Sequence, residues 1–244
     1  MELSTAYQPR REPPVIDSSV LDRMQAMLQT WEQAADPRAV FLSCYRLMTR
    51  NVQQAIQAGE FQDGVWVGAF LHRFADYYFD AVEADARREP DTPAVWRRTL
   101  DAARQRETAP VQNLLLGVNA HINYDLVLTL VETLEPEWAQ LSPAQREQRQ
   151  SDHDHINDII GRTVDGVQDQ VLDRYTSWMD LVDRVFGPLD EWMVSRVISH
   201  WRTRDWAYAM RWLETSGAEA RDELRRRLED STLRLADVIL LGRD

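Results

Sequence analysis

Residues 110–134 read PVQNLLLGVNAHINYDLVLTLVETL, and this stretch decides the fold class. Its apolar residues recur at intervals of three and four, which is the period of a helix packed on one face. Pro110 stands where the first helical residue is expected. One stripe along the predicted helix is formed by Leu114, Val118, His121, Asp125 and Leu128. Two polar residues therefore interrupt a face that is otherwise suited to a protein core.

The helical period extends along the rest of the chain. Proline follows a capping or loop residue at four probable helix starts, Asp36-Pro37, Thr92-Pro93, Ala109-Pro110 and Ser142-Pro143. We expect helices near residues 17–34, 37–58, 64–88, 93–106, 110–134, 143–174, 176–186, 188–214 and 217–241. No convincing stretch alternates as a β-strand does. The sequence predicts an all-α fold: a single compact multi-helix bundle of about eight or nine helices over residues 17–244, after a flexible N-terminal tail at residues 1–16.

Composition limits the classes of function. The 244 residues are 44% hydrophobic and carry a net charge of -12, which indicates a globular protein whose surface repels nucleic acid and anionic lipid. All 28 basic residues are arginine, so Schiff-base chemistry and a P-loop lysine are excluded. Cys44 has no second cysteine to pair with, and no apolar run approaches the roughly 18 residues of a membrane span. We therefore expect a cytoplasmic protein without a nucleic-acid or membrane partner.

Histidines cluster with acidic residues. His72 precedes Asp76 by four residues, His121 precedes Asp125 by four, and residues 152–158 read DHDHIND. Residues four apart share one face of a helix, so each pair points an imidazole and a carboxylate the same way. Mixed ligands of this kind suit a divalent metal such as zinc, manganese or iron. We predict His72, Asp76, His121 and Asp125 as metal ligands.

The pair in the core stripe has a second interpretation. A buried carboxylate needs a partner, which is a cation, an arginine or the neighbouring histidine. His121 and Asp125 can therefore simply satisfy each other and anchor the helix. Asn119 and Asn123, also four apart, are predicted to supply neutral hydrogen-bonding groups for a substrate beside them.

Three functions remain open on this basis. The first is a metal-dependent hydrolase-like enzyme for a small-molecule substrate, in which His155 and Asp158 complete the centre or act as general base and Arg202 or Arg204 orients an anion. The second is a metal-free cyclase or isomerase that uses His121 and Asp125 as an acid/base pair in an aromatic-lined pocket. The third is a non-catalytic helical interaction protein. The motifs HExxH and Gly-x-Ser-x-Gly are absent, which disfavours zincin proteases and serine hydrolases.

The string GVNAHINYDL at residues 117–126 resembles a bacterial domain-of-unknown-function family, number 5995. Supporting similarity runs through Phe41-Leu42, residues 59–61, residues 74–78 and residues 157–160, so it covers roughly residues 35–215. The resemblance implies a helical fold and carries no reaction with it. A looser likeness is to the all-helical zinc-dependent phospholipase C and nuclease group, whose sites also combine histidine and aspartate at HxxxD spacing.

Overall fold

The structure is a computed structural model that describes residues 19–170 and 191–241. Within these ranges every regular element is a helix. The helices are α1 (Ser19–Gln33), α2 (Arg38–Gln57), α3 (Gly64–Ala86), α4 (Ala94–Ala103), α5 (Pro110–Ala120), η1 (His121–Asp125), α6 (Leu126–Trp138), α7 (Pro143–Gln170), α9 (Glu191–Glu214) and α10 (Ala218–Leu241). The all-α bundle is confirmed. The tail predicted for residues 1–16 and the helix predicted near 176–186 lie outside the described residues.

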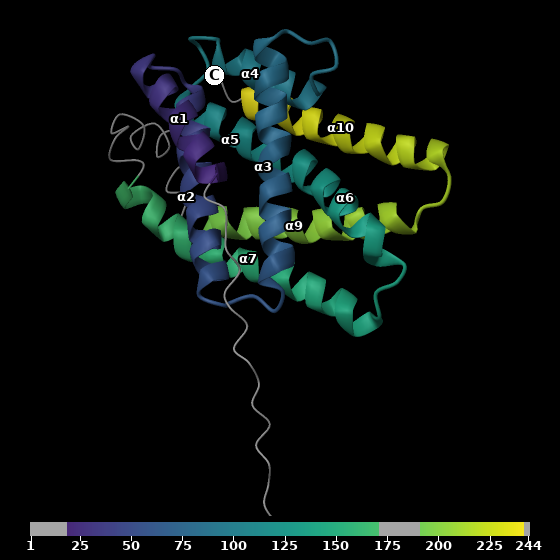
Figure 1. Ribbon diagram of the computed structural model, residues 1–244. Coiled ribbons are helices and arrows are strands. Elements are labelled where there is room, and N and C mark those ends of the chain that lie inside the picture. The colour runs from purple at the N-terminus through teal and green to yellow at the C-terminus, as the bar shows by residue number, and fades with distance from the viewer. Residues whose placement is uncertain (1–18, 171–190, 242–244) are drawn as a thin grey trace, which may run out of the picture.

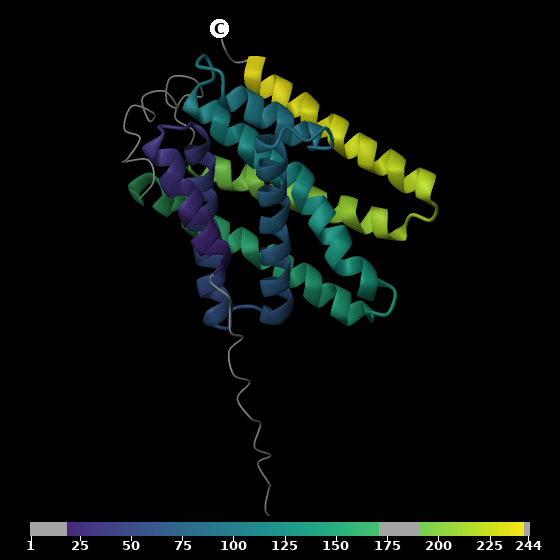
Figure 2. The same cartoon turned by 45° about the horizontal axis from the view of Figure 1, so that its top comes forward.

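The bundle has two sets of helices that run across each other (Figure 1). Helices α1, α2 and α3 stand side by side, while α9 and α10 form an antiparallel hairpin that crosses them, with α7 beside α9. The rotated view in Figure 2 shows the same crossing. The continuous run of α5, η1 and α6 passes between the two sets and contacts α2, α3, α9 and α10. Residues 110–138 are therefore the central helix of the bundle.

The four proline signals mark helix starts to within one residue. Pro110 and Pro143 are the first residues of α5 and α7, while Pro37 and Pro93 immediately precede α2 and α4. Proline suits these positions because the first helical N–H groups have no partner inside the helix. Local sequence thus sets the helix boundaries.

The central helix is apolar enough to be mistaken for a membrane span. Residues Pro110–Trp138 pass the length and hydropathy test for one, but 72% of the apolar window is buried inside the bundle. Its side chains meet those of the surrounding helices in a core that includes Leu126, Leu130 and Leu134, each fully buried. A core helix of a globular bundle explains its composition.

Five residues of the central helix, His121–Asp125, form a π-helical turn. The backbone N–H of Leu126 donates to the carbonyl of His121, five residues earlier. Such turns are rare and are frequently found at functional sites. The neighbouring helix α10 supports this one, because the Thr232 hydroxyl donates to the Asn123 carbonyl at 3.1 Å. The turn carries both residues of the predicted His121–Asp125 pair.

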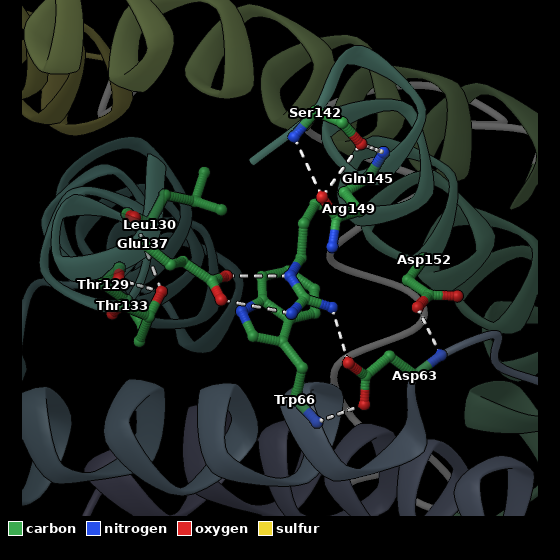
Figure 3. A network of polar contacts seen from close by, with 10 residues as sticks. All are labelled: Asp63, Trp66, Thr129, Leu130, Thr133, Glu137, Ser142, Gln145, Arg149 and Asp152. Atoms are coloured by element: carbon green, nitrogen blue, oxygen red, sulfur yellow. Dashed lines mark hydrogen bonds and ion pairs between the residues drawn. The ribbon is translucent and has the colours of Figure 1, made fainter. Parts of the chain in front are cut away.

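The polar N-terminal half of α7 holds a loop and two helix ends together (Figure 3). The Arg149 guanidinium donates to Glu137 of α6 at 2.9 Å and to Asp63 at 2.7 Å. Asp63 in turn caps α3 by accepting the N–H of Trp66 at 3.0 Å. The Asp152 carboxylate accepts the N–H groups of residues 62 and 63, each at 2.8 Å. The segment is polar because it anchors the connection between α2 and α3.

We expect the Arg149→Met substitution to lower the free energy of unfolding by about 1–3 kcal/mol, because it removes charge-assisted hydrogen bonds from a side chain that is 13% exposed. Urea unfolding followed by circular dichroism measures the change. Arg87→Met is the control, since Arg87 is 62% exposed and its ion pairs face solvent. Equal effects at the two positions would contradict the role assigned to Arg149.

Candidate active site at the π-helix

The centre of the candidate site is a buried set of three hydrogen-bonded side chains. The Nδ1 atom of His121 lies 3.0 Å from Oδ2 of Asp125, and the indole N–H of Trp96 donates to both carboxylate oxygens at 3.0 Å. None of the three side chains is more than 3% exposed. Trp96 reaches the pair from α4, so a separate helix fixes the carboxylate. This set holds the imidazole ring in one orientation.

Aromatic rings enclose the imidazole. Phe74 stacks on His121 with the ring centroids 3.7 Å apart and the planes 12° apart. Tyr45 approaches edge-on at 4.2 Å, and Phe41 lies at 5.9 Å. Phe41 and Tyr45 belong to α2 and Phe74 belongs to α3. The aromatic-lined surroundings predicted for this pair are present.

Burial controls the protonation of the pair. It lowers the pKa of His121 well below its ordinary value, with the positive charge of Arg202 acting in the same direction. Burial also raises the pKa of Asp125, and the Trp96 hydrogen bond offsets this in part. A lone charge on either group is therefore disfavoured. The pair can take or give one proton at Nε2 of His121 while the bond between Nδ1 and Asp125 keeps the ring in place.

An apolar cavity of about 80 Å³ adjoins the imidazole. It lies where α2, α3, α7, α9 and the π-helix meet, at the junction of two apolar clusters of the core. The residues around it are Tyr45, Met48, Thr49, Val52, Val67, Phe70, Leu71, Phe74, His121, Ile122, Ile156, Ile160 and Arg202. Polar groups are few in this set, so each one bears on what the cavity can bind.

Two of the polar atoms beside the cavity have no hydrogen-bond partner among the described residues. They are the hydroxyl oxygen of Tyr45 and Nε2 of His121, and both are buried. Burial and the nearby Asp125 carboxylate raise the pKa of Tyr45 well above its ordinary value, so the phenol keeps its proton. An unpaired buried polar atom is costly. A ligand in the cavity would relieve that cost at both atoms.

Asn119 and Asn123 lie beside the pair and bond to protein. Asn119 donates to the Thr232 carbonyl of α10 at 3.0 Å, and Asn123 donates to Asn119 at 2.8 Å. Arg204 donates to the Asn123 side-chain oxygen at 2.7 Å and also to Asp205. The two amides and Arg204 therefore fasten the π-helix to α9 and α10. None of them is among the described residues that line the cavity.

The histidines of the third cluster, residues 152–158, lie in different surroundings. His155 is partly exposed on α7, lies 3.3 Å from both Asp158 and Glu60, and is not among the residues that line the cavity beside His121. His153 is fully buried against Trp206, with ring centroids 4.9 Å apart. His155 and Asp158 therefore do not join His121 in a common centre, and their predicted role as general base has no support from this geometry.

His153 should make the fold sensitive to acid. Burial and the charge of Arg202 lower its pKa from 6.5 to about 4. The unfolded chain therefore takes up this proton first, and stability falls as the pH drops from about 6.5, by about 3 kcal/mol at pH 4. Asp205 works in the opposite direction, since burial raises its pKa to about 6 and protonation below that pH favours the folded state.

We expect His153→Gln to remove this contribution, so the wild type loses about 3 kcal/mol more than the variant between pH 6.5 and pH 4. Urea unfolding at several pH values gives the two curves. Parallel curves for wild type and His153→Gln would contradict the prediction.

The predicted metal ligands are distributed over two helices. His72 and Asp76 are partly exposed on α3, and the described contacts include no bond between them. Among the side chains of residues 19–163 and 196–241, which the structure describes, no group of three or more His, Cys, Asp or Glu is arranged to hold a metal ion. A zinc, manganese or iron site built from His72, Asp76, His121 and Asp125 stays a prediction, without a matching cluster in the described part of the chain.

Several residues of the site were not predicted from sequence. Trp96 reaches Asp125, and Tyr45 and Phe74 reach the imidazole of His121, from three other helices. The spacing of these residues in the chain carries no signal for those contacts. Asn157 and the His153 carbonyl bind Arg202, which was predicted only as an anion contact. Contacts between helices distant in sequence depend on the packing, so single-sequence patterns do not reveal them.

The fold and site define an all-α protein with a buried His–Asp pair beside an apolar cavity. A family model described as "Family of unknown function (DUF5995)" matches residues 18–242. The chain belongs to this family, and the resemblance noted at residues 117–126 is confirmed. Neither the curated proteins nor the solved structures contain a match to the chain.

Proposed function

We propose that the protein is a metal-free acid/base enzyme that binds a small, largely apolar molecule in the cavity and moves a proton on it. The observation that carries the proposal is the unpaired Nε2 atom of His121, beside the cavity, on a ring whose Nδ1 is held by Asp125. Tyr45 offers a second unpaired polar group, a neutral hydroxyl that donates a hydrogen bond. Together these two residues of the cavity lining provide a proton acceptor and a hydrogen-bond donor for one ligand.

Isomerisation and cyclisation suit this arrangement because both need only a proton removed at one atom and returned at another. The aromatic and aliphatic surroundings exclude water, which strengthens every electrostatic interaction with the ligand. Asp125 and Trp96 keep the imidazole fixed and so reduce the reorganisation that accompanies proton transfer. We assign proton transfer to His121 and hydrogen-bond donation to Tyr45.

The two other functions remain distinguishable by experiment. A metal-dependent hydrolase requires carboxylates that converge on His121, and Asp125 is already occupied by Trp96 and His121 itself. The bond between His121 and Asp125 also fits a pair with a purely structural role. That role does not explain why Nε2 of His121 is buried without a partner. The acid/base enzyme accounts for both observations.

The test is conversion of small molecules by the full-length protein. The protein is incubated in deuterated water with a small-molecule extract of the source cells, and mass spectrometry records consumed, formed or deuterium-labelled compounds. Wild-type protein should convert at least one compound, and His121→Gln should lower that rate about 100-fold or more. His155→Gln is the matched control and should keep the rate.

The same assay separates the alternatives. Activity that survives a chelator supports proton transfer without a metal, whereas activity lost to the chelator and restored by zinc, manganese or iron favours the hydrolase. A folded His121→Gln variant as active as the wild type would overturn the proposal. Wild-type protein that converts nothing would favour the helical interaction protein.

A further inference from the structure

A buried positive charge lies beside the same cavity. Arg202 of α9 is 2% exposed, and it is among the residues that line the cavity. Its guanidinium donates from Nε to the Asn157 side-chain oxygen at 2.8 Å and from Nη2 to the His153 carbonyl at 3.0 Å. Both acceptors are neutral. Among the side chains described, those of residues 19–163 and 196–241, no carboxylate forms an ion pair with Arg202.

The charged groups around Arg202 act on it only from a distance. Asp205 is bonded by Arg204, and Asp154 is 46% exposed next to His153. These two carboxylates raise the pKa of Arg202, but burial outweighs them and lowers it to about 10. Arg202 is therefore still charged at neutral pH. The two nearest imidazoles, His121 and His153, are held neutral in part by that charge.

An isolated buried cation is expensive unless an anion pairs with it. The cavity limits the kind of anion, because its other surroundings are hydrocarbon side chains such as Met48, Val67 and Ile156. One arginine balances one negative charge, and a planar guanidinium matches a carboxylate. A phosphate carries more charge than Arg202 alone can neutralise. The volume of about 80 Å³ is about half that of an engineered cavity known to hold benzene, so the apolar part of the ligand is short.

We propose that the cavity binds a short apolar carboxylic acid as its anion, with the carboxylate paired to Arg202 and the hydrocarbon chain against α2, α3 and α7. This inference rests on the proposed function and adds the class of its ligand. It also gives Arg202 a role distinct from that of His121. Arg202 fixes the ligand, and His121 moves the proton.

Wild-type protein tests this directly with matched ligand pairs. Isothermal titration calorimetry compares acetate and isovalerate with acetamide and isovaleramide at neutral pH. The anions should bind at least about tenfold more tightly than the amides of the same shape. Isovalerate should bind more tightly than acetate because it fills more of the cavity. Equal binding of acid and amide, or no binding of any acid at millimolar concentration, would overturn the proposal.

Variants locate the bound anion. Arg202→Met should weaken isovalerate binding about tenfold or more, and Arg202→Lys should recover part of the affinity because it keeps the charge without the planar fork. Arg211→Met is the matched control, because Arg211 is exposed on the same helix and is not among the residues that line the cavity. This variant should bind isovalerate as the wild type does. Filling the cavity by Val67→Phe should abolish binding. If the Arg202 variants do not fold, the acid and amide comparison on the wild type decides.

Failure here can be told apart from failure of the proposed function. If acids bind through Arg202 but the protein converts no compound, the proposed enzyme activity is contradicted and the proposed ligand class is supported. If the protein converts neutral compounds in a reaction that depends on His121, and binds no acids, the proposed ligand class is contradicted and the proposed enzyme activity is supported.

Discussion

Asp125→Ala should lower the free energy of unfolding by about 3–5 kcal/mol, which is a large part of the stability of an ordinary domain. The change leaves the indole N–H of Trp96 and Nδ1 of His121 without partners inside the core. It also opens a space between α4 and the central helix. Urea unfolding of the full-length protein measures the loss, with the melting temperature as a second reading.

Two control variants distinguish the contribution of Asp125 to stability from its contribution to proton transfer. Asp125→Asn should cost about 1 kcal/mol, because an amide can still accept from Trp96 and donate to His121. It should nevertheless abolish proton transfer, since an amide cannot hold the shared proton. Asp158→Ala removes a carboxylate that is 75% exposed and also next to a histidine, and should change stability by no more than about 0.5 kcal/mol. A loss below about 1 kcal/mol for Asp125→Ala would contradict the assigned role.

Gly117→Ala should destabilise the protein by about 1–3 kcal/mol, although alanine is the better helix former. An added Cβ at this position would lie 2.4 Å from Cγ of Phe41 and 2.9 Å from its Cβ. The Phe41 ring cannot withdraw easily, because it packs against Tyr78 and His121 with centroids 5.5 Å and 5.9 Å away. The central helix therefore approaches α2 as closely as it does only because residue 117 lacks a side chain.

Gly68→Ala is the control for this prediction, because no atom lies within 4 Å of a Cβ built there. That substitution should stabilise α3 by about 0.5–1 kcal/mol. The double variant Gly117→Ala with Phe41→Leu should be less destabilised than the sum of its single changes, since the smaller side chain makes room. Equal effects of alanine at residues 68 and 117, measured by urea unfolding, would exclude the clash.

The features of the fold that depend on neighbouring residues, such as where a helix starts, could be predicted from the sequence. The apolar period at three and four, together with proline at residues 37, 93, 110 and 143, predicted the starts of α2, α4, α5 and α7 to within one residue. These features are properties of one segment at a time, because helix starts depend on unpaired backbone groups and on the fixed backbone angle of proline. The central helix runs four residues further than predicted, to Trp138, with Pro136 inside it. The π-helical turn at residues 121–125 has no sequence signal that separates it from an α-helix.

The candidate site could be predicted from the sequence only in part. Spacing alone placed His121 and Asp125 on one face, and the apolar neighbours in the stripe predicted that both are buried, as they are. The same spacing at His72 and Asp76 predicted a second half of a metal centre, but α3 turns Phe74 onto the imidazole and leaves that pair partly exposed. Two helices can present the same motif while only one directs it into the core.

By itself the sequence determined the all-helical class, the starts of several helices and a polar pair inside an apolar stripe, because each depends on residues within a few turns of one another. The tertiary structure decided that Trp96 holds Asp125, that Tyr45 and Phe74 enclose His121, and that Arg202 lies buried beside an apolar cavity. Those contacts join residues far apart in the chain. Their formation depends on how whole helices cross, and helix crossing is set by the packing of many side chains at once.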